Sequence, residues 1–338
     1  MRKLDIVAFL KGYAIFTIII FHYLQALHLP APFSQLIFFG GTGVHLFVLL
    51  SGFGLHLSYL NKPIPYTVYL KKRTGKIYFP YIAVVLVSAL ISLFIPIYDN
   101  SLYALGGHIF LYKMFDESIM GSYGYPLWFI SMILQFYVAF YAIVFLTRRF
   151  NYKYFLLICL FLSMAWIVFV LAIGKEPERV WNSFFLRYLW EFALGMVIAS
   201  KLKENDYQLP FKPRPIWFLI IGVFNCVLYA FLAMKGGDIG KMLNDIPALI
   251  GYSCIAVWIF QLNIEMINKF FLFTGRISYQ LYLLHFLVLL LALHLLELSP
   301  GVAIIGIALI VTYLVSILYQ KVISGKERRV LAPGSSTV

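Results

Sequence analysis

The sequence predicts an all-α fold: a polytopic membrane helix bundle of about ten transmembrane helices with both termini in the cytoplasm. Of the 338 residues, 62% are hydrophobic and only 12% are charged, about half the charged share usual in a soluble domain. The mean hydropathy is +0.88. A water-soluble globule of this length cannot bury so much apolar surface. The composition therefore excludes a soluble enzyme, a disordered chain and a fibrous protein.

Ten apolar stretches are long enough to cross a bilayer as helices, which takes roughly 20 residues each. Their approximate bounds are 6–28, 36–60, 77–98, 126–147, 154–174, 184–200, 216–234, 246–264, 277–296 and 301–320. Each is expected to be helical because lipid offers no hydrogen-bond partner for an open backbone. We expect one membrane domain, residues 1–324, followed by a short cytoplasmic tail, residues 325–338.

The basic residues predict the orientation. If the N-terminus is cytoplasmic, most of the 27 Lys and Arg residues fall in cytoplasmic segments, as the positive-inside rule requires. We interpret the net charge of +13 as membrane anchoring and expect no nucleic-acid partner. The expected location is a multi-pass position in the cell membrane, specifically a bacterial plasma membrane. The three cysteines lie inside apolar runs without metal-ligand spacing, so neither a disulfide framework nor a bound metal is expected.

Two ionisable residues, Lys11 and His22, lie within the first predicted span. Eleven residues are close to three helical turns, so both side chains project from nearly the same face, roughly 16 Å apart along the axis. Such groups cost about 2.5–3.5 kcal/mol in mid-span and usually face a cavity or each other. Two interpretations remain open: a functional pair, or a lysine that reaches the headgroups and a histidine bonded to a nearby carbonyl.

Other polar candidates follow along the chain. Ser51 belongs to a Ser-Gly-Phe sequence in the second span, which by itself indicates close helix packing. Arg73 and Lys76 lie in the predicted cytoplasmic loop before the third span. They share a face if this part is helical, and either anchor the chain or bind an anionic ligand. Arg187 and Glu191 are four residues apart and are predicted to pair within one helix.

Together these features resemble the integral-membrane acyltransferase 3 family over nearly the whole chain. The resemblance rests on the order of several short motifs. They are a basic residue before a first-span His, Gly-Val-x-Leu-Phe…Ser-Gly-Phe in the second span, a basic cluster ending in Pro, Trp…Gln-Phe-Tyr in the fourth span, Glu-Phe-x-x-Gly in the sixth, and a late Gly-Arg-Ile-Ser-Tyr-x-Leu-Tyr-x-x-His.

The resemblance implies transfer of an acyl group, often acetyl, from a cytoplasmic coenzyme A (CoA) thioester to a hydroxyl on the other side of the membrane. The acceptors in this family are typically cell-surface glycans or lipids. The partners implied are therefore an acyl-CoA donor, acetyl-CoA in the commonest case, a glycan or lipid acceptor, and the bilayer itself. Acyl-CoA is a substrate here, and no permanently bound cofactor is expected.

The family's functional residues map onto this sequence one by one. His22 matches the essential first-span His, as general base or as the group that takes the acyl chain itself. Lys11 matches its basic partner, which is more often Arg. Arg73 and Lys76 match a cytoplasmic Arg-x-x-Arg that binds the donor. Ser51 matches the second-span motif and is a candidate relay.

Two positions depart from the family pattern. His45 stands where an acidic residue is common, and the fourth span lacks the acidic residue that many members carry before the position of Gln135. These departures argue against a carboxylate-assisted mechanism. Glu191 in span six and His285, near the middle of span nine, complete the candidate site residues.

Two other functions also fit the composition. A transporter or flippase for a sugar or a lipid-linked glycan would show intramembrane cations, although it would more often carry paired broken helices in two halves. A structural or regulatory membrane protein would use the basic loop only to bind anionic lipid.

Overall fold

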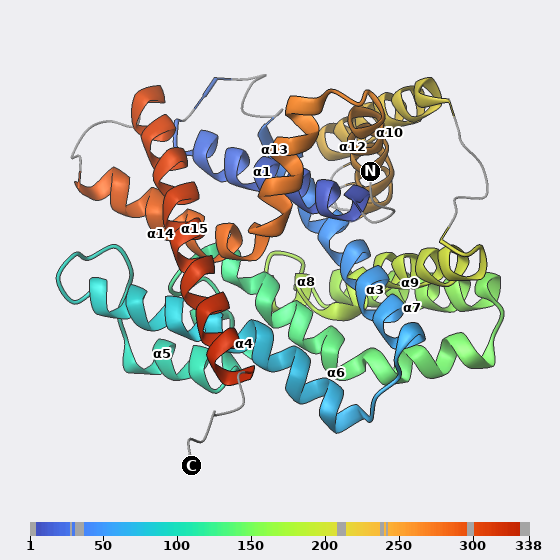
Figure 1. Cartoon of the computed structure of the whole chain (residues 1–338), viewed down its shortest axis with the longest axis horizontal. Helices are drawn as coiled ribbons and strands as arrows, with labels where there is room; N and C mark the ends of the chain where they lie inside the picture. Colours follow the sequence, from blue (N-terminus) through green and yellow to red (C-terminus); the bar gives the residue numbers. More distant parts are fainter. Residues whose placement is uncertain are drawn as a thin grey trace, which may run out of the picture.

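The computed structural model describes residues 5–27, 29–30, 37–207, 214–236, 240, 243–295 and 301–331. This part of the chain is built from helices joined by turns (Figure 1), and it contains nine helical segments long and apolar enough to cross a membrane. The structure confirms the predicted all-α, polytopic membrane fold. The remaining predicted span, 246–264, is the eighth in chain order and is present as a shorter apolar helix, α12 (Asp245–Gln261).

The long helices follow the predicted spans in order. They are α1 (Asp5–Gln25), α3 (Gly43–Asn61) preceded by η1 (Phe38–Thr42), α4 (Tyr66–Ile91), α6 (Trp128–Arg149), α7 (Tyr152–Ala172), α9 (Leu189–Glu204), α10 (Pro215–Lys235), α14 (Ser278–Leu295) and α15 (Val302–Leu331). Shorter helices connect them: α5 (Leu102–Ile109), η2 (Tyr112–Phe115), η3 (Glu117–Ile119), η4 (Tyr125–Leu127), α8 (Arg179–Asn182), η5 (Phe185–Tyr188) and α13 (Glu265–Arg276). Residues 332–338 of the predicted tail lie outside the described residues.

The third span differs from the prediction. It was expected at 77–98, but α4 begins at Tyr66 and ends at Ile91. Arg73 and Lys76 therefore lie on a helix and not in a loop before it. Lys and Arg are good helix formers, and their long side chains reach polar surroundings from within a span, so hydropathy alone placed this boundary too late.

The helix α13 was not predicted, because the sequence analysis treated residues 265–276 as a connection between two spans. Its apolar face packs on α1. The Phe271 ring lies 5.0 Å from that of Phe9 and 5.5 Å from that of Tyr13, measured between centroids. Figure 1 shows α13 crossing α1 steeply and leading into α14. An amphipathic sequence of twelve residues therefore folds as a helix because α1 offers an apolar surface for its apolar face to cover.

Glycines bring α1 and α13 into main-chain contact. A Cβ atom added at Gly12 would lie 1.9 Å from the carbonyl oxygen of Phe271, and one added at Gly275 would lie 1.9 Å from that of Ala8. No real Cβ tolerates such distances, so only glycine fits at either position. The crossing point lies directly after Lys11 on α1 and shortly before the start of α14.

A second pair of glycines joins α3 to α9. A Cβ at Gly52 would lie 2.1 Å from the carbonyl oxygen of Phe192, and one at Gly195 would lie 2.0 Å from that of Leu49. This contact agrees with the packing role that the Ser-Gly-Phe sequence indicated. At the edge of the bundle, most side chains of α10 are exposed, including Phe224 and Phe231, as expected of a helix that faces lipid.

Candidate active site

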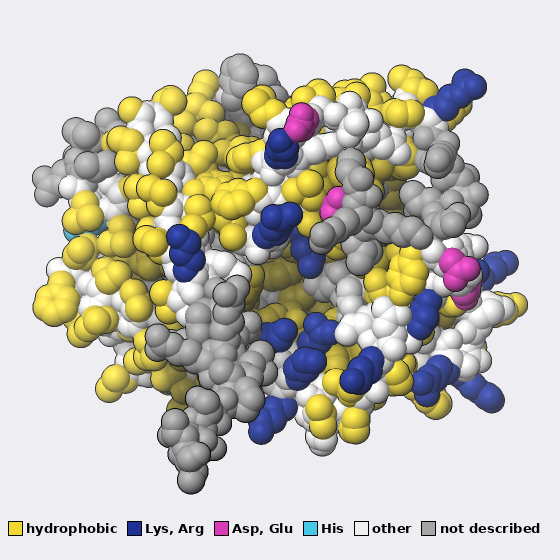
Figure 2. Space-filling view, viewed as in Figure 1, with side chains coloured by type: hydrophobic (Ala, Val, Ile, Leu, Met, Phe, Trp, Pro, Cys, Tyr) yellow, Lys and Arg dark blue, Asp and Glu magenta, His cyan; other side chains and the backbone are white. Residues whose placement is uncertain are grey.

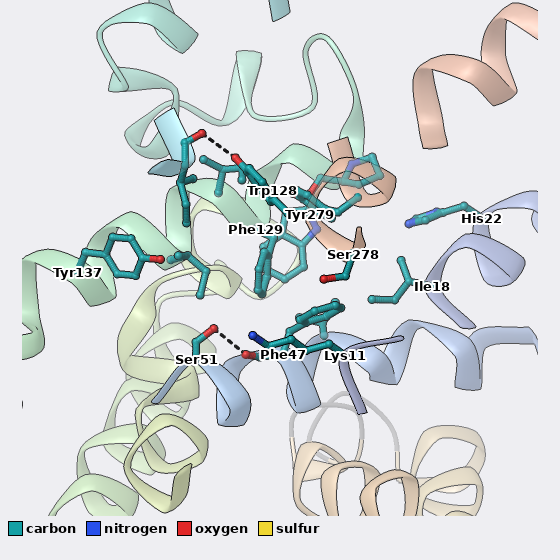
Figure 3. Close-up of a pocket in the computed structure, with 16 residues that line it drawn as sticks. Lys11, Ile18, His22, Phe47, Ser51, Trp128, Phe129, Tyr137, Ser278 and Tyr279 are labelled. Atoms are coloured by element: carbon teal, nitrogen blue, oxygen red, sulfur yellow. Dashed lines mark hydrogen bonds between the residues drawn. The ribbon is translucent and has the colours of Figure 1, made fainter. Parts of the chain in front are cut away.

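A cavity of about 230 Å³ lies among α1, α3, α4, α6 and α14. Most of its wall is aromatic or aliphatic, and its polar groups are few. They include Lys11, His22, Ser51, Tyr137, Ser278 and Tyr279. In Figure 3, His22 and Tyr137 lie at opposite ends of this group, with Lys11 and Ser278 between them. Lys11 and His22 thus line one cavity, and the shared face that their eleven-residue spacing predicted is the face toward it.

His22 has a second histidine beside it. The ring centroids of His22 and His285 are 5.3 Å apart, with an angle of 32° between the planes. His285 is fully buried, and its Nδ1 lies 2.8 Å from the carbonyl oxygen of Tyr282 and 3.1 Å from that of Leu281. The first and ninth predicted spans therefore bring two imidazoles together inside the bundle.

Ser51 lines the same cavity, but its hydroxyl is already engaged. Its Oγ donates a 2.8 Å hydrogen bond to the carbonyl oxygen of Phe47, one turn earlier in α3 (Figure 3). This is a common use of a serine inside a helix. The oxygen can still accept a hydrogen bond from a molecule in the cavity, so Ser51 is better suited to orient a ligand than to relay a proton.

A second cavity, of about 270 Å³, opens between α3 and α4 and is rich in basic groups. Lys62, Lys72 and Arg73 line it together with three tyrosines, and Arg73 Nη2 donates a 2.8 Å hydrogen bond to Ser58 Oγ. Figure 2 shows Lys and Arg side chains gathered around a hollow on this face of the molecule. Lys76 is exposed and lines neither cavity. The structure thus separates the two cations that the sequence had paired.

The two cavities approach each other at a pair of tyrosines. Tyr69 lines the basic cavity and Tyr137 lines the cavity with His22, and their ring centroids are 6.4 Å apart. Arg73 also lies close enough to Lys11 for the two positive charges to repel each other. A chain of basic groups therefore leads from the surface hollow toward the buried histidines.

A network of ionisable side chains lies near the N-terminal ends of α3, α9 and α12, whereas the basic cavity lies at the C-terminal end of α3. His45 Nδ1 is 2.7 Å from Glu191 Oε1, and His45 Nε2 is 3.5 Å from Asp245 Oδ1. Arg187 Nη2 is 2.9 Å from Asp245 Oδ2. Arg187 and Glu191 were expected to pair with each other, but each takes a partner on another helix. The reason is local: Arg187 lies in the 3-10 helix η5, so the two residues are not on one continuous α-helix.

Three residues of this network are potential metal ligands. His45, Glu191 and Asp245 place one ligand atom each within 4.8 Å of one another. A cation at that point would face the guanidinium of Arg187, and both imidazole nitrogens already face carboxylate oxygens. Each carboxylate of Glu191 and Asp245 thus faces a basic side chain, His45 or Arg187, and this arrangement favours an ion network over a metal site. Asp245 was missed from the sequence, where it stands just before an apolar run as an ordinary flanking charge.

Lys113, in the segment between α4 and α6, is fully buried, and its Nζ has no hydrogen-bond partner among the described residues. Burial lowers the pKa of Lys113 to about 7. Its neighbour His108 is also buried, and burial together with the charge of Lys113 lowers the pKa of that imidazole to about 2. His108 is instead held as a neutral ring by Tyr81 Oη at 2.6 Å and Ser122 Oγ at 2.8 Å.

Ser278 and Tyr279 are wall residues that the sequence analysis did not single out. They begin α14 directly after the break at Ile277, and Ser278 is 9% exposed. Tyr279 Oη donates a 2.6 Å hydrogen bond to the carbonyl oxygen of Ile77 on α4. The only available signal was the family-like Ile-Ser-Tyr sequence, because no proline marks the helix break.

The comparisons with known proteins agree with this architecture. A family model described as an acyltransferase domain matches residues 4–321. No curated protein and no solved structure matches the chain. The family match covers most of the sequence and includes every helix that lines the two cavities. The chain therefore belongs to the acyltransferase 3 family and is a membrane acyltransferase.

Proposed function

We propose that this acyltransferase moves an acyl group, acetyl in the simplest case, from cytoplasmic acyl-CoA to a hydroxyl of a glycan or lipid outside a bacterial plasma membrane. The observation that carries the proposal is the cavity that joins Lys11 to His22, with the basic cavity adjacent to it. Family membership favours transfer over the transporter and flippase alternatives.

The basic cavity suits the phosphate-bearing end of the donor. Lys62, in the turn after α3, and Lys72 and Arg73, on α4, converge on it. Guanidinium and ammonium groups bind phosphate oxygens through charge-assisted hydrogen bonds. With the N-terminus in the cytoplasm, this cavity opens on the side where acyl-CoA is made. Lys76, exposed on the same helix, attracts the donor at longer range without touching it.

The pantetheine arm of the donor would enter the cavity lined by Lys11 and His22. Lys11 and His22 are separated by roughly 16 Å along α1, a length comparable to the extended pantetheine arm that carries the thioester. Lys11 then lies beside the phosphate end of the arm, and His22 lies beside the thioester. The mostly apolar wall excludes water, which would otherwise hydrolyse the thioester.

His22 supplies the acid–base chemistry. The acceptor oxygen attacks the thioester carbonyl carbon while a ring nitrogen of His22 takes the hydroxyl proton. The carbon–sulfur bond then breaks, and the departing thiolate takes that proton to give free CoA. In the alternative route the same nitrogen attacks the thioester carbon and displaces the CoA thiolate; the acceptor oxygen then displaces the imidazole from the acyl group, and the acceptor proton passes to the thiolate. Label that stays on the protein after rapid gel filtration at neutral pH without acceptor, and that hydroxylamine removes, distinguishes the acyl-enzyme route from direct transfer.

The test is transfer of label from [14C]acetyl-CoA to the glycan and lipid fractions of membrane vesicles that contain the protein. His22→Ala is expected to abolish transfer while the protein remains in the membrane at normal levels. His294→Ala changes an exposed histidine at the end of α14 and is expected to keep full activity. Transfer that persists in His22→Ala rejects the proposal, and movement of a glycan without acylation favours a transporter.

The role of Lys11 in donor binding is tested by keeping or reversing the charge of its side chain. Lys11→Arg keeps a cation in the cavity and is expected to keep donor affinity, whereas Lys11→Glu places an anion beside the donor and is expected to raise the KM for acetyl-CoA at least tenfold. An unchanged KM in the charge reversal means that Lys11 only anchors α1 in the membrane.

A further inference from the structure

We infer that His285 is a positioning residue for His22: its Nε2 accepts the ring N–H of His22 and leaves the other nitrogen of His22 free to take the acceptor proton. The inference rests on the proposed function of His22 and assigns a role to a second buried group of the same site. It explains how this chain orients a catalytic imidazole without a carboxylate.

The surroundings of His285 fix its tautomer. Its Nδ1 lies within hydrogen-bond distance of two carbonyl oxygens, those of Tyr282 and Leu281, at 2.8 and 3.1 Å. Carbonyl oxygens only accept hydrogen bonds, so Nδ1 carries the proton. In the neutral ring the lone pair therefore resides on Nε2. Both contacts come from the preceding turn of α14, which makes this assignment independent of any ligand.

The Nε2 atom lacks a partner of its own. It is fully buried, and no hydrogen bond to it is present in the described part of the chain. Leaving a buried polar group unsatisfied costs about 1–3 kcal/mol. His285 Nε2 is therefore a buried hydrogen-bond acceptor without a partner, beside His22, the proposed base in the wall of the cavity.

The spacing of the two rings suits a direct hydrogen bond. An N–H···N bond of about 2.9 Å between two imidazoles, whose nitrogens lie about 1.1 Å from the ring centres, places the centroids about 5 Å apart. The observed centroid distance between His22 and His285 is 5.3 Å. The bond itself is not present in the structure: the His22 side chain is hydrogen-bonded to Gln25, so the His22 ring must turn for one of its N–H groups to reach Nε2.

The backbone around this pair is held by Tyr23, the residue after His22. Tyr23 Oη donates a 2.9 Å hydrogen bond to the main-chain carbonyl oxygen of His285 and lies 2.5 Å from Thr312 Oγ1 on α15. On the other side, the Phe286 ring packs edge-on against His22 at 5.7 Å. The distance between the two imidazoles is therefore fixed by α1, α14 and α15 together.

The chemical role follows from this geometry. When His22 takes the acceptor proton it becomes an imidazolium, and the bond to Nε2 stabilises the N–H on its far side. His285 gains no proton and forms no covalent bond, and the proton on His22 still leaves with the CoA thiolate. A base held in one tautomer and one orientation works on the same principle as a base held by a carboxylate.

Two substitutions separate positioning from packing. In His285→Asn, the amide nitrogen takes the place of Nδ1 and keeps the bond to the helix carbonyls, but nothing reaches the position of Nε2. In His285→Gln, the amide oxygen reaches that position and accepts from His22. We expect Asn to lower kcat for [14C]acetyl transfer tenfold to a hundredfold, Gln to stay within about fivefold of the wild type, and both to keep the KM for acetyl-CoA.

Equal loss in Asn and Gln, or full activity in Asn, overturns the inference. If both variants fail to fold, as judged by aggregation in detergent chromatography, nitrogen-15 magnetic resonance of histidine-labelled wild-type protein replaces them. His285 should then show a protonated Nδ1 and an unprotonated Nε2, and the opposite tautomer overturns the assignment. Activity in His22→Ala would reject the proposed function itself, whereas loss there with full activity in His285→Asn rejects only the role of His285.

Discussion

His45 on α3 and Glu191 on α9 are joined across the bundle by a 2.7 Å contact between Nδ1 and Oε1. Glu191 is fully buried, and its second carboxylate oxygen has no partner among the described residues. His45 also faces Asp245 on α12, so one imidazole links three helices. A residue that departs from the family pattern thus belongs to a network that ties the N-terminal ends of these helices together.

Removal of Glu191 should destabilise the protein strongly. Glu191→Ala leaves His45, which is only 13% exposed, without its nearest partner, and breaking a buried pair costs about 3–5 kcal/mol. The matched control is Glu204→Ala on the same helix, because the ion pair of Glu204 with Lys201 is half exposed and is worth about 0–1 kcal/mol. Thermal unfolding in detergent measures both. Similar melting temperatures for the two variants would contradict a structural role for the network.

The contact between α3 and α9 should tolerate no side chain at Gly52. Gly52→Ala places a methyl group against the carbonyl oxygen of Phe192, so the helices must separate and the yield of folded protein should fall sharply. Gly54, two residues later, has nothing within 4 Å of an added Cβ, and Gly54→Ala should behave like the wild type. Fluorescence-detected size-exclusion chromatography compares the two, and equal profiles would show that the crossing adapts to a methyl group.

The two cations of α4 should differ in their effect on the donor. Arg73 lines the basic cavity, whereas Lys76 lies exposed outside both cavities. Arg73→Gln removes a charge-assisted contact to phosphate, and we expect the KM for acetyl-CoA to rise at least tenfold. Lys76→Gln should raise it less than threefold, and that small effect should vanish at high salt because exposed charges are screened. The reverse ranking would remove the basic cavity as the donor site.

Lys113 should make stability depend on pH. Burial holds its pKa in the folded protein at about 7, whereas an unfolded lysine titrates near 10.4. Between these values the unfolded chain binds one proton more, so stability rises with pH from about 7 to 10. Below pH 7 the folded protein must bury the charge. Lys113→Met should therefore raise the melting temperature, most at pH 6 and least at pH 9.5.

Lys175→Met is the control for Lys113, since Lys175 is 44% exposed and pairs with Glu178 at the surface. Its effect on the melting temperature should be small and nearly independent of pH. A constant difference between Lys113→Met and the wild type from pH 6 to 9.5 would mean that Lys113 remains charged in the folded protein.

The sequence predicted the helical spans well where apolar runs end at charges or prolines, as for α7 and α10. It placed α4 too late because the cations around Arg73 lowered the hydropathy of a segment that is helical all the same. It missed α13, because a short amphipathic helix is stabilised by the surface it covers and that surface belongs to α1, more than 250 residues earlier in the chain.

The candidate site was predictable only within single helices. The spacing of Lys11 and His22 correctly indicated a shared face, since that face depends on helix geometry alone. The partners of Glu191 and Arg187 depend on how α3 and α12 pack against α9, and no local spacing contains that information. The separation of Arg73 from Lys76 likewise depends on where α3 ends beside α4.

The crossing of α1 and α13 at Gly12 and Gly275 has a consequence for mutational scans. Lys11 precedes one glycine, and the other lies three residues before the cavity wall begins at Ser278. An alanine at either position would push α1, which carries His22, away from α13, which leads directly into the helix of His285, although neither glycine lines the cavity. An activity screen would then score both as essential, and only a measurement of helix separation would show that they act as spacers and not as chemical groups.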